Sequence, residues 1–93
     1  MTIYHPIIEG HEALEKGMQL VKAESSRLIV RISLNNLERT IDIIEFLGFY
    51  YKVDLNVDKL DFKFQEIEED EAKRLLEVMT IIADAEVLKF GKF

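Results

Sequence analysis

Two histidines near the start of the chain are the first residues whose type and spacing could support chemistry. His5 and His11 are the only histidines, and together with Glu9 and Glu12 they form the segment His-Pro-Ile-Ile-Glu-Gly-His-Glu. Imidazole and carboxylate groups are suitable ligands for zinc or iron. The spacing matches no metal motif, and short clusters of this kind are often incidental. We therefore expect no metal and no other cofactor, with His5 and His11 as weak candidates for a metal site.

Residues for nucleophilic catalysis are sparse. The chain has no cysteine, which removes thiol chemistry, thiolate metal sites and disulfides. Ser25, Ser26 and Ser33 have no adjacent histidine base, and the four glycines form no phosphate-binding loop. The acidic run over 66–71 lacks the alternating oxygen ligands and the glycine of a calcium loop. We expect a protein that is not an enzyme.

Basic side chains at alternating strand positions form the most suggestive candidate site. Arg31, Lys52, Lys63 and Lys89 fall, together with Tyr50, on one open face of the predicted sheet. Such a patch could bind a small anion, an acidic partner or RNA. The net charge of −6 repels a phosphate backbone on average, which argues against nucleic acid as a partner. The competing interpretation is a solvated face of salt bridges, which contribute little to stability.

Exposed aromatic residues indicate contact with other proteins. Phe46 falls on the polar side of a predicted helix, Tyr50 falls on the open sheet face, and Phe93 lies at the end of the chain. The strand expected over 49–57 would be a long edge rich in aromatic residues, and unpaired edges favour pairing with another chain. We therefore expect a homodimer, and an unidentified protein as a further partner.

The hydrophobic pattern indicates which elements position these residues. A helical pattern extends from Glu9 to about Glu24, and Leu28 to Leu34 alternates as a strand. The segment 36–47 is predicted to be a helix, because Asn35 and Glu38 resemble a capping box and Gly48 could form the left-handed C-terminal cap. Its apolar arc comprises Leu37, Ile41, Ile43, Ile44 and Leu47.

The second half of the chain predicts a hairpin, a helix and a last strand. Strands over 49–57 and 60–65 are expected to pair with Leu55 opposite Leu60 and with Asp54 opposite Asp61. A helix is expected from about Glu68 to Asp84, since apolar residues recur there at helical spacing. A final strand is expected over 86–90.

The order of these elements predicts an α+β fold, the ferredoxin-like βαββαβ sandwich. That fold has a four-stranded antiparallel sheet with two helices on one face, here with an extra N-terminal helix. We expect one domain over 1–93, in which 1–26 form the N-terminal extension and helix and 27–93 form the core. The expected inner face comprises Leu28, Val30, Ile32, Tyr51, Val53, Leu55, Leu60, Phe62 and Phe64.

Several functional hypotheses remain open from the sequence. The chain shows neither a secretory signal nor a segment that could span a membrane, so we expect a cytoplasmic protein without a membrane partner. The leading hypothesis is a small, non-catalytic regulatory or adaptor domain that acts through protein–protein contacts as a homodimer. One alternative is a regulatory module that binds a small ligand or anion on the open sheet face. The other is nucleic-acid binding by the local basic patch.

Overall fold

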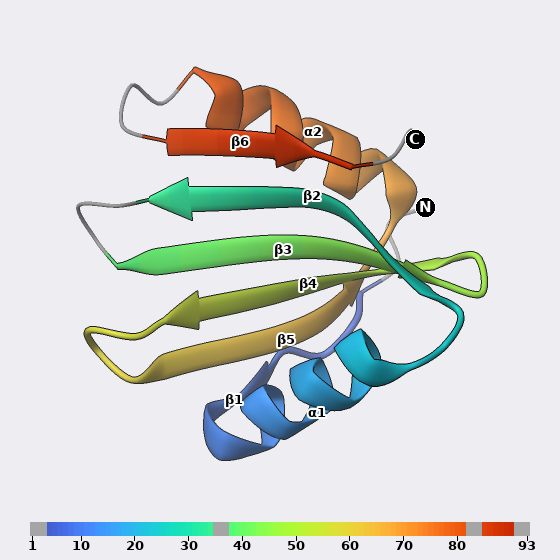
Figure 1. The fold of residues 1–93 in the computed structure, drawn as a ribbon, viewed down its shortest axis with the longest axis vertical. Coiled ribbons are helices and arrows are strands. Elements are labelled where there is room, and N and C mark those ends of the chain that lie inside the picture. Colours follow the sequence, from blue (N-terminus) through green and yellow to red (C-terminus); the bar gives the residue numbers. More distant parts are fainter. Residues whose placement is uncertain (1–3, 35–37, 82–84, 91–93) are drawn as a thin grey trace.

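The computed structural model describes residues 4–34, 38–81 and 85–90, and within them the side chains of Thr80, Ala85 and Lys89 are not described. Two helices and six strands follow one another along the chain (Figure 1). They are β1 (Ile8–Glu9), α1 (Gly10–Lys22), β2 (Ser26–Leu34), β3 (Arg39–Phe46), β4 (Phe49–Asn56), β5 (Asp61–Ile67), α2 (Glu69–Thr80) and β6 (Ala85–Lys89).

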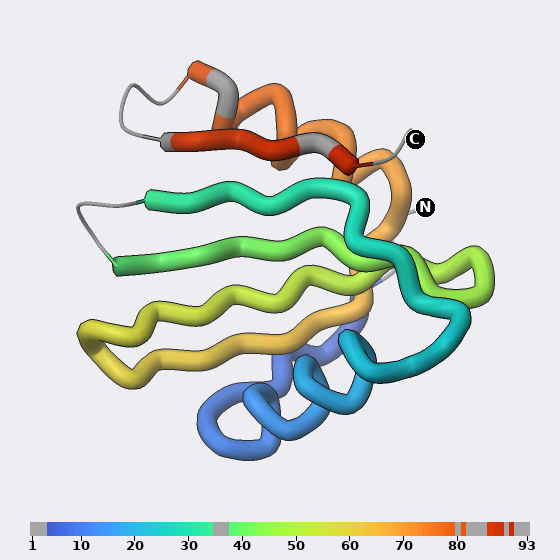
Figure 2. Tube along the Cα trace, viewed as in Figure 1, coloured from blue at the N-terminus to red at the C-terminus, as the bar shows by residue number. Residues whose placement is uncertain are grey.

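All six strands form one antiparallel sheet in the order β1-β5-β4-β3-β2-β6. The tube in Figure 2 shows the chain running back and forth through β2, β3, β4 and β5 before α2 carries it to the opposite edge. There β6 pairs with β2, so the strand that is last in sequence lies beside the first long one.

The predicted ferredoxin-like sandwich with a four-stranded sheet is therefore wrong, although the fold is α+β. The two additional strands arise in the segment 36–47, which was expected to be a helix and instead contains β3, and at Ile8–Glu9, where no strand was expected and β1 forms. Ile41 and Ile43 point to one side of the sheet, and Ile44 points to the other. A strand that is buried on both sides does not alternate between apolar and polar residues, so its pattern is easily mistaken for that of a helix.

The glycine that seemed to cap a helix instead closes a hairpin. Phe46 pairs directly with Phe49, which leaves Leu47 and Gly48 as a two-residue loop. Both loop residues have positive φ, at 51° and 87°. This is the backbone of a type I′ turn, whose twist matches that of paired antiparallel strands. Glu38, the expected capping residue, also has a positive φ of 47° in the turn before β3, and Asn35 lies outside the described residues.

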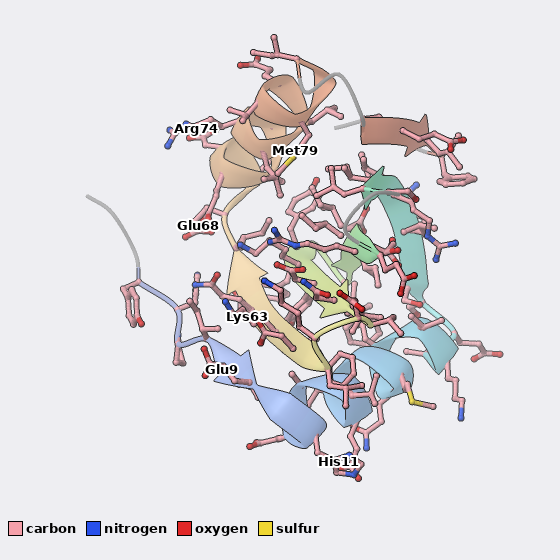
Figure 3. All side chains as sticks on the ribbon, turned by 90° about the vertical axis from the view of Figure 1, so that its left-hand side faces the viewer. Glu9, His11, Lys63, Glu68, Arg74 and Met79 are labelled. Carbon is pink, nitrogen blue, oxygen red and sulfur yellow. The ribbon has the colours of Figure 1, made fainter. Side chains whose placement is uncertain are left out.

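The two helices cover opposite faces of the sheet rather than the same face. Leu20 of α1 packs with Ile44 and Val53 on one side, which we call the α1 face. Ala72 of α2 packs with a separate cluster on the other side, the α2 face, that contains Ile43 and the other buried isoleucines of β2 and β3. The side view in Figure 3 places α2, marked by Arg74 and Met79, at the opposite end of the sheet from α1, marked by His11.

The expected single inner face is divided between these two cores. Val30 and Ile32 pack under α2, whereas Tyr51, Val53 and Phe64 pack under α1. A β-bulge between Leu28 and Val30 adds to the division, because it turns Leu28 toward α1 while Ile29 joins Val30 under α2. Phe62 and Leu55, which pair directly, are both half-buried on the α1 face.

The predicted β4–β5 hairpin exists, but its register is shifted from the expected one. Leu55 pairs with Phe62, and Asp54 pairs with Lys63 instead of Asp61. Leu60 lies in the turn with a φ of 51° and is exposed, so it is not a core residue. The observed register places opposite charges directly across the two strands, which is more favourable than the like-charge pairing expected from the sequence.

Four other expected elements are where the sequence places them. The N-terminal helix, the strand over 28–34, the helix after Glu68 and the final strand are confirmed as α1, β2, α2 and β6. Gly17 allows α1 to approach the sheet closely, since a Cβ at this position would lie 3.0 Å from Cγ1 of Val53.

Candidate functional site

The basic residues predicted to share one open face are divided between the two faces of the sheet. Arg31 pairs with Asp42, which in turn pairs with Val53, so these side chains lie on the α1 face. Lys52 pairs with Ile43, and Lys63 pairs with Asp54, so both lysines lie on the α2 face. The backbone of Lys89 pairs with Val30 in β6, and its side chain lies outside the described part.

Arg31 is occupied by a carboxylate on the neighbouring strand. Its Nε and Nη2 donate to Oδ1 and Oδ2 of Asp42 at 2.9 and 3.1 Å. Only 7% of Asp42 is exposed. The hydrogen bonds from Arg31 to Asp42, followed by the attraction between their charges, raise the pKa of Arg31. The guanidinium therefore serves first to compensate a buried carboxylate on the α1 face.

A second pair of this kind lies on the α2 face and was not anticipated from the sequence. Nε and Nη2 of Arg39 donate to Oδ1 and Oδ2 of Asp54 at 2.8 and 2.5 Å, and Asp54 is also buried. This hydrogen bonding raises the pKa of Arg39. Arg27 likewise pairs with Glu45 across β2 and β3. These two pairs could not be predicted while 36–47 was expected to be a helix. Each arginine lies opposite its carboxylate only when β3 is a strand.

The lysines on the α2 face are less firmly held than these arginines. Lys52 is half-buried beside Gln65 in the register, and Nζ of Lys63 lies 3.9 Å from Oδ2 of Asp61. The competing interpretation of this face, a solvated set of salt bridges, therefore describes Arg39, which pairs with Asp54 across β3 and β4, and Lys63, whose contact with Asp61 lies within β5.

The aromatic residues expected at an interface are mostly part of the cores. Tyr50 packs against the cluster beneath α2, and burial raises its pKa, with a smaller effect from Glu69. Phe46 is half-buried and packs in the cluster beneath α1. It lies on β3, not on the polar side of a helix. Phe93 lies outside the described residues.

The two histidines have different surroundings. Nε2 of His5 is buried without a hydrogen-bond partner, 3.7 Å from Glu66 and 3.8 Å from Glu68, and its carbonyl accepts a 2.8 Å hydrogen bond from Gln65. His11 is exposed on α1. Within the ranges that the structure describes, no group of three potential ligands is arranged to hold a metal ion.

A small apolar groove runs between α1 and the sheet. It has a volume of about 240 Å³, and the exposed Met18 and Val21 form part of its rim. Its lining comprises Leu14, Gly17, Met18, Val21, Lys22, Asp42, Val53 and Leu55. No signal in the sequence indicated this groove, because it exists only where α1 leaves part of the α1 face uncovered.

The strand over 49–57 was expected to form a long open edge, but this is wrong, because β4 lies between β3 and β5. A different edge, that of β6, is the other prominent feature of the described sheet. Along the described chain β6 pairs with β2 alone, so its second side is an open strand edge. Leu88 of β6 and Phe90, the residue after it, are both exposed. On α2, which packs beside β6, Val78 is also exposed. Apolar side chains thus flank an unpaired strand edge from both faces of the sheet.

Comparison with known proteins adds no family to this description. No family model, no curated protein and no solved structure matches the chain. Neither α1 nor α2, the helices of the described part, is long and apolar enough to cross a membrane. The surfaces described above are therefore the basis for a functional hypothesis.

Proposed function

We propose that this protein is a small, non-catalytic interaction domain that acts through protein–protein contacts as a homodimer. The supporting observation is the amount of surface that the fold leaves exposed. The chain of 10.9 kDa exposes 6328 Å². A folded monomer of this mass exposes about 5,600 Å² by the usual scaling with size. The chain therefore exposes more surface than is typical of a monomer of its mass.

The placement of the charged groups also supports contact rather than chemistry. The arginines of β2 and β3 are each paired with a carboxylate on a neighbouring strand, so their charge is used within the sheet. Exposed apolar side chains occur on α1, beside the groove, and around the β6 edge, and also at the β3–β4 and β4–β5 turns. Apolar patches of this kind are typical of surfaces that another protein covers. The cytoplasm is the proposed location, and microscopy of the tagged chain in its native host tests it.

Sedimentation velocity over a range of concentrations tests the proposed self-association. We expect the mass to rise from 10.9 kDa toward twice that value as the concentration increases through the micromolar range. Hiding apolar surface is the driving force, so the dimer should persist in high salt, which also screens the net charge of −6 on each copy. A single monomeric species up to high micromolar concentration would contradict the proposal.

The apolar groove favours a second candidate function, the binding of a small amphiphile. Lys22 stands among otherwise apolar lining residues of α1, and Asp42 is already paired with Arg31. An apolar tail in the groove with an anionic head group at Lys22 matches this arrangement. In an NMR titration with sodium octanoate, the methyl signals of Val53 and Leu55 should shift, and Lys22→Glu should weaken binding. Unchanged methyl signals at millimolar octanoate would eliminate this candidate.

A further inference from the structure

The open edge of β6 presents a defined set of backbone groups. The amide of Phe90 donates to the carbonyl of Ile29 in β2 at 2.8 Å. In an antiparallel strand the N–H and C=O groups of successive residues point alternately to the two sides. The amides of Glu86 and Leu88 therefore point toward β2, as that of Phe90 does. Those of Val87 and Lys89 point outward, where the described chain supplies no strand.

One side of α2 faces this same edge. In Figure 3, Met79 points from α2 toward the sheet and Arg74 points away from it. Glu69 marks the side of the helix that faces β4, because it lines a small cavity together with Tyr50, and Lys73 pairs with Glu69 at 3.2 Å.

Val78 lies on the other side of the helix. It is turned by about 140° from Lys73, since successive helical residues rotate by about 100°. The flank of α2 opposite Glu69 and Lys73 therefore carries Val78, which is 49% exposed and is turned by about 40° from Arg74. A second molecule placed at the β6 edge would cover the exposed part of this apolar side chain.

We infer that a second copy of this chain pairs with the β6 edge, strand β6 against strand β6, around a two-fold axis at Val87. The inference rests on the proposed homodimer and specifies its geometry. Antiparallel pairing about an axis perpendicular to the sheet keeps each face continuous, so two six-stranded sheets become one of twelve strands. Val87 then exchanges two backbone hydrogen bonds with the partner's Val87, and Ala85 pairs with the partner's Lys89.

This arrangement uses the apolar side chains on both faces of the edge. On the α2 face, the two α2 helices lie on either side of the axis with their Val78 sides directed toward each other. On the α1 face, Leu88 and Phe90 line the junction between the two sheets. The opposite edge is a poorer alternative, because β1 has only two residues and so offers few hydrogen bonds.

Amide hydrogen exchange tests the pairing directly. In the monomer at low concentration, the amide of Leu88 should be protected by β2 while that of Val87 exchanges rapidly. In the dimer at high concentration, Val87 and Lys89 should become protected as well. If the chain self-associates while the Val87 amide stays in rapid exchange, the β6 pairing is wrong but the homodimer stands. If the chain never self-associates, the proposed function fails as well.

A matched pair of substitutions on α2 tests the role of Val78. Val78→Lys places a charge beside the two-fold axis, and the dimer dissociation constant should rise roughly tenfold or more. Ile81→Lys changes the net charge equally, at a residue that is 82% exposed at the end of the same helix, and should leave the constant unchanged. Both residues are exposed in the monomer, so both variants should fold. Equal weakening by the two substitutions, or no weakening by Val78→Lys, would overturn this geometry.

Discussion

The carboxylate of Asp42 accepts hydrogen bonds from both Nε and Nη2 of Arg31 across β2 and β3, at 2.9 and 3.1 Å. Asp42 is almost fully buried on the α1 face, so the main role of the pair is to stabilise the fold. The equivalent pair of Arg39 and Asp54 lies on the α2 face. Among the residues that the structure describes, each face of the sheet thus contains one buried aspartate that depends on a single arginine.

Replacing Arg31 should therefore lower stability more than replacing another arginine. We expect Arg31→Ala to lower the free energy of unfolding by about 1–3 kcal/mol, because a buried carboxylate loses its hydrogen-bond donors. Arg74→Ala is the matched control, since Arg74 is exposed on α2 and should change stability by less than about 0.5 kcal/mol. Urea unfolding of the two variants measures the difference. Equal effects would show that Asp42 does not depend on Arg31.

The close approach of α1 to β4 at Gly17 gives a second prediction. Gly17→Ala should gain about 1 kcal/mol of helix propensity. Its new Cβ, however, would lie 3.0 Å from Cγ1 of Val53, and relieving this contact should make the substitution destabilising in the native background. In a Val53→Ala background the contact is absent, so the same substitution should stabilise. A double-mutant cycle by urea unfolding measures the coupling. The same effect in both backgrounds would contradict the close packing.

A substitution in the turn between β3 and β4 should raise the stability of the protein. Leu47 is exposed and has a φ of 51°, a conformation that a leucine rarely adopts and that asparagine tolerates. Leu47→Asn would create the Asn-Gly pair that type I′ turns favour. We expect the midpoint of thermal unfolding to rise, corresponding to roughly 0.5–1 kcal/mol. A lower midpoint would contradict the two-residue hairpin loop at 47–48.

Alkaline pH should destabilise the protein through Tyr51. Burial raises the pKa of Tyr51 above its ordinary value of 10.0, and Glu66 raises it further. The folded state holds this proton more tightly than the unfolded state, so the stabilisation is complete below about pH 10 and is lost as the pH rises through the folded pKa. Urea unfolding between pH 8 and pH 11 should show a decline in stability that is smaller in Tyr51→Phe. Tyr4→Phe, at an exposed position, should leave the decline unchanged.

The sequence was a good guide to elements with one apolar side and a poor guide to those with two. The sequences of α1 and α2 show the helical period clearly, and the alternation from Leu28 to Leu34 predicts a strand. β3 is different, because Ile41 and Ile43 are buried under α2 while Ile44 is buried under α1. The hydrophobic pattern of β3 therefore lacks the alternation that identifies a strand with one exposed face. Gly48 suits a helix cap and a hairpin turn equally well.

The candidate site could be predicted less well than the fold, for the same reason. Once β3 is a strand, Arg31 and Lys63 lie on opposite faces, and the basic patch built on one shared face is divided. The β-bulge at Ile29 changes which side chains of β2 point to each face, and nothing in the local sequence marks it.

The central claim, that two copies join at β6, has one especially direct test. In the proposed pairing, Glu86 lies opposite the partner's Leu88 in a non-hydrogen-bonded pair, where the two Cα atoms approach to about 4.5 Å. An isotope-filtered nuclear Overhauser experiment on mixed labelled and unlabelled chain should therefore show a cross-peak between the Hα atoms of Glu86 and Leu88 from different copies. A dimer that lacks this cross-peak and shows intermolecular contacts at α1 instead would contradict the account.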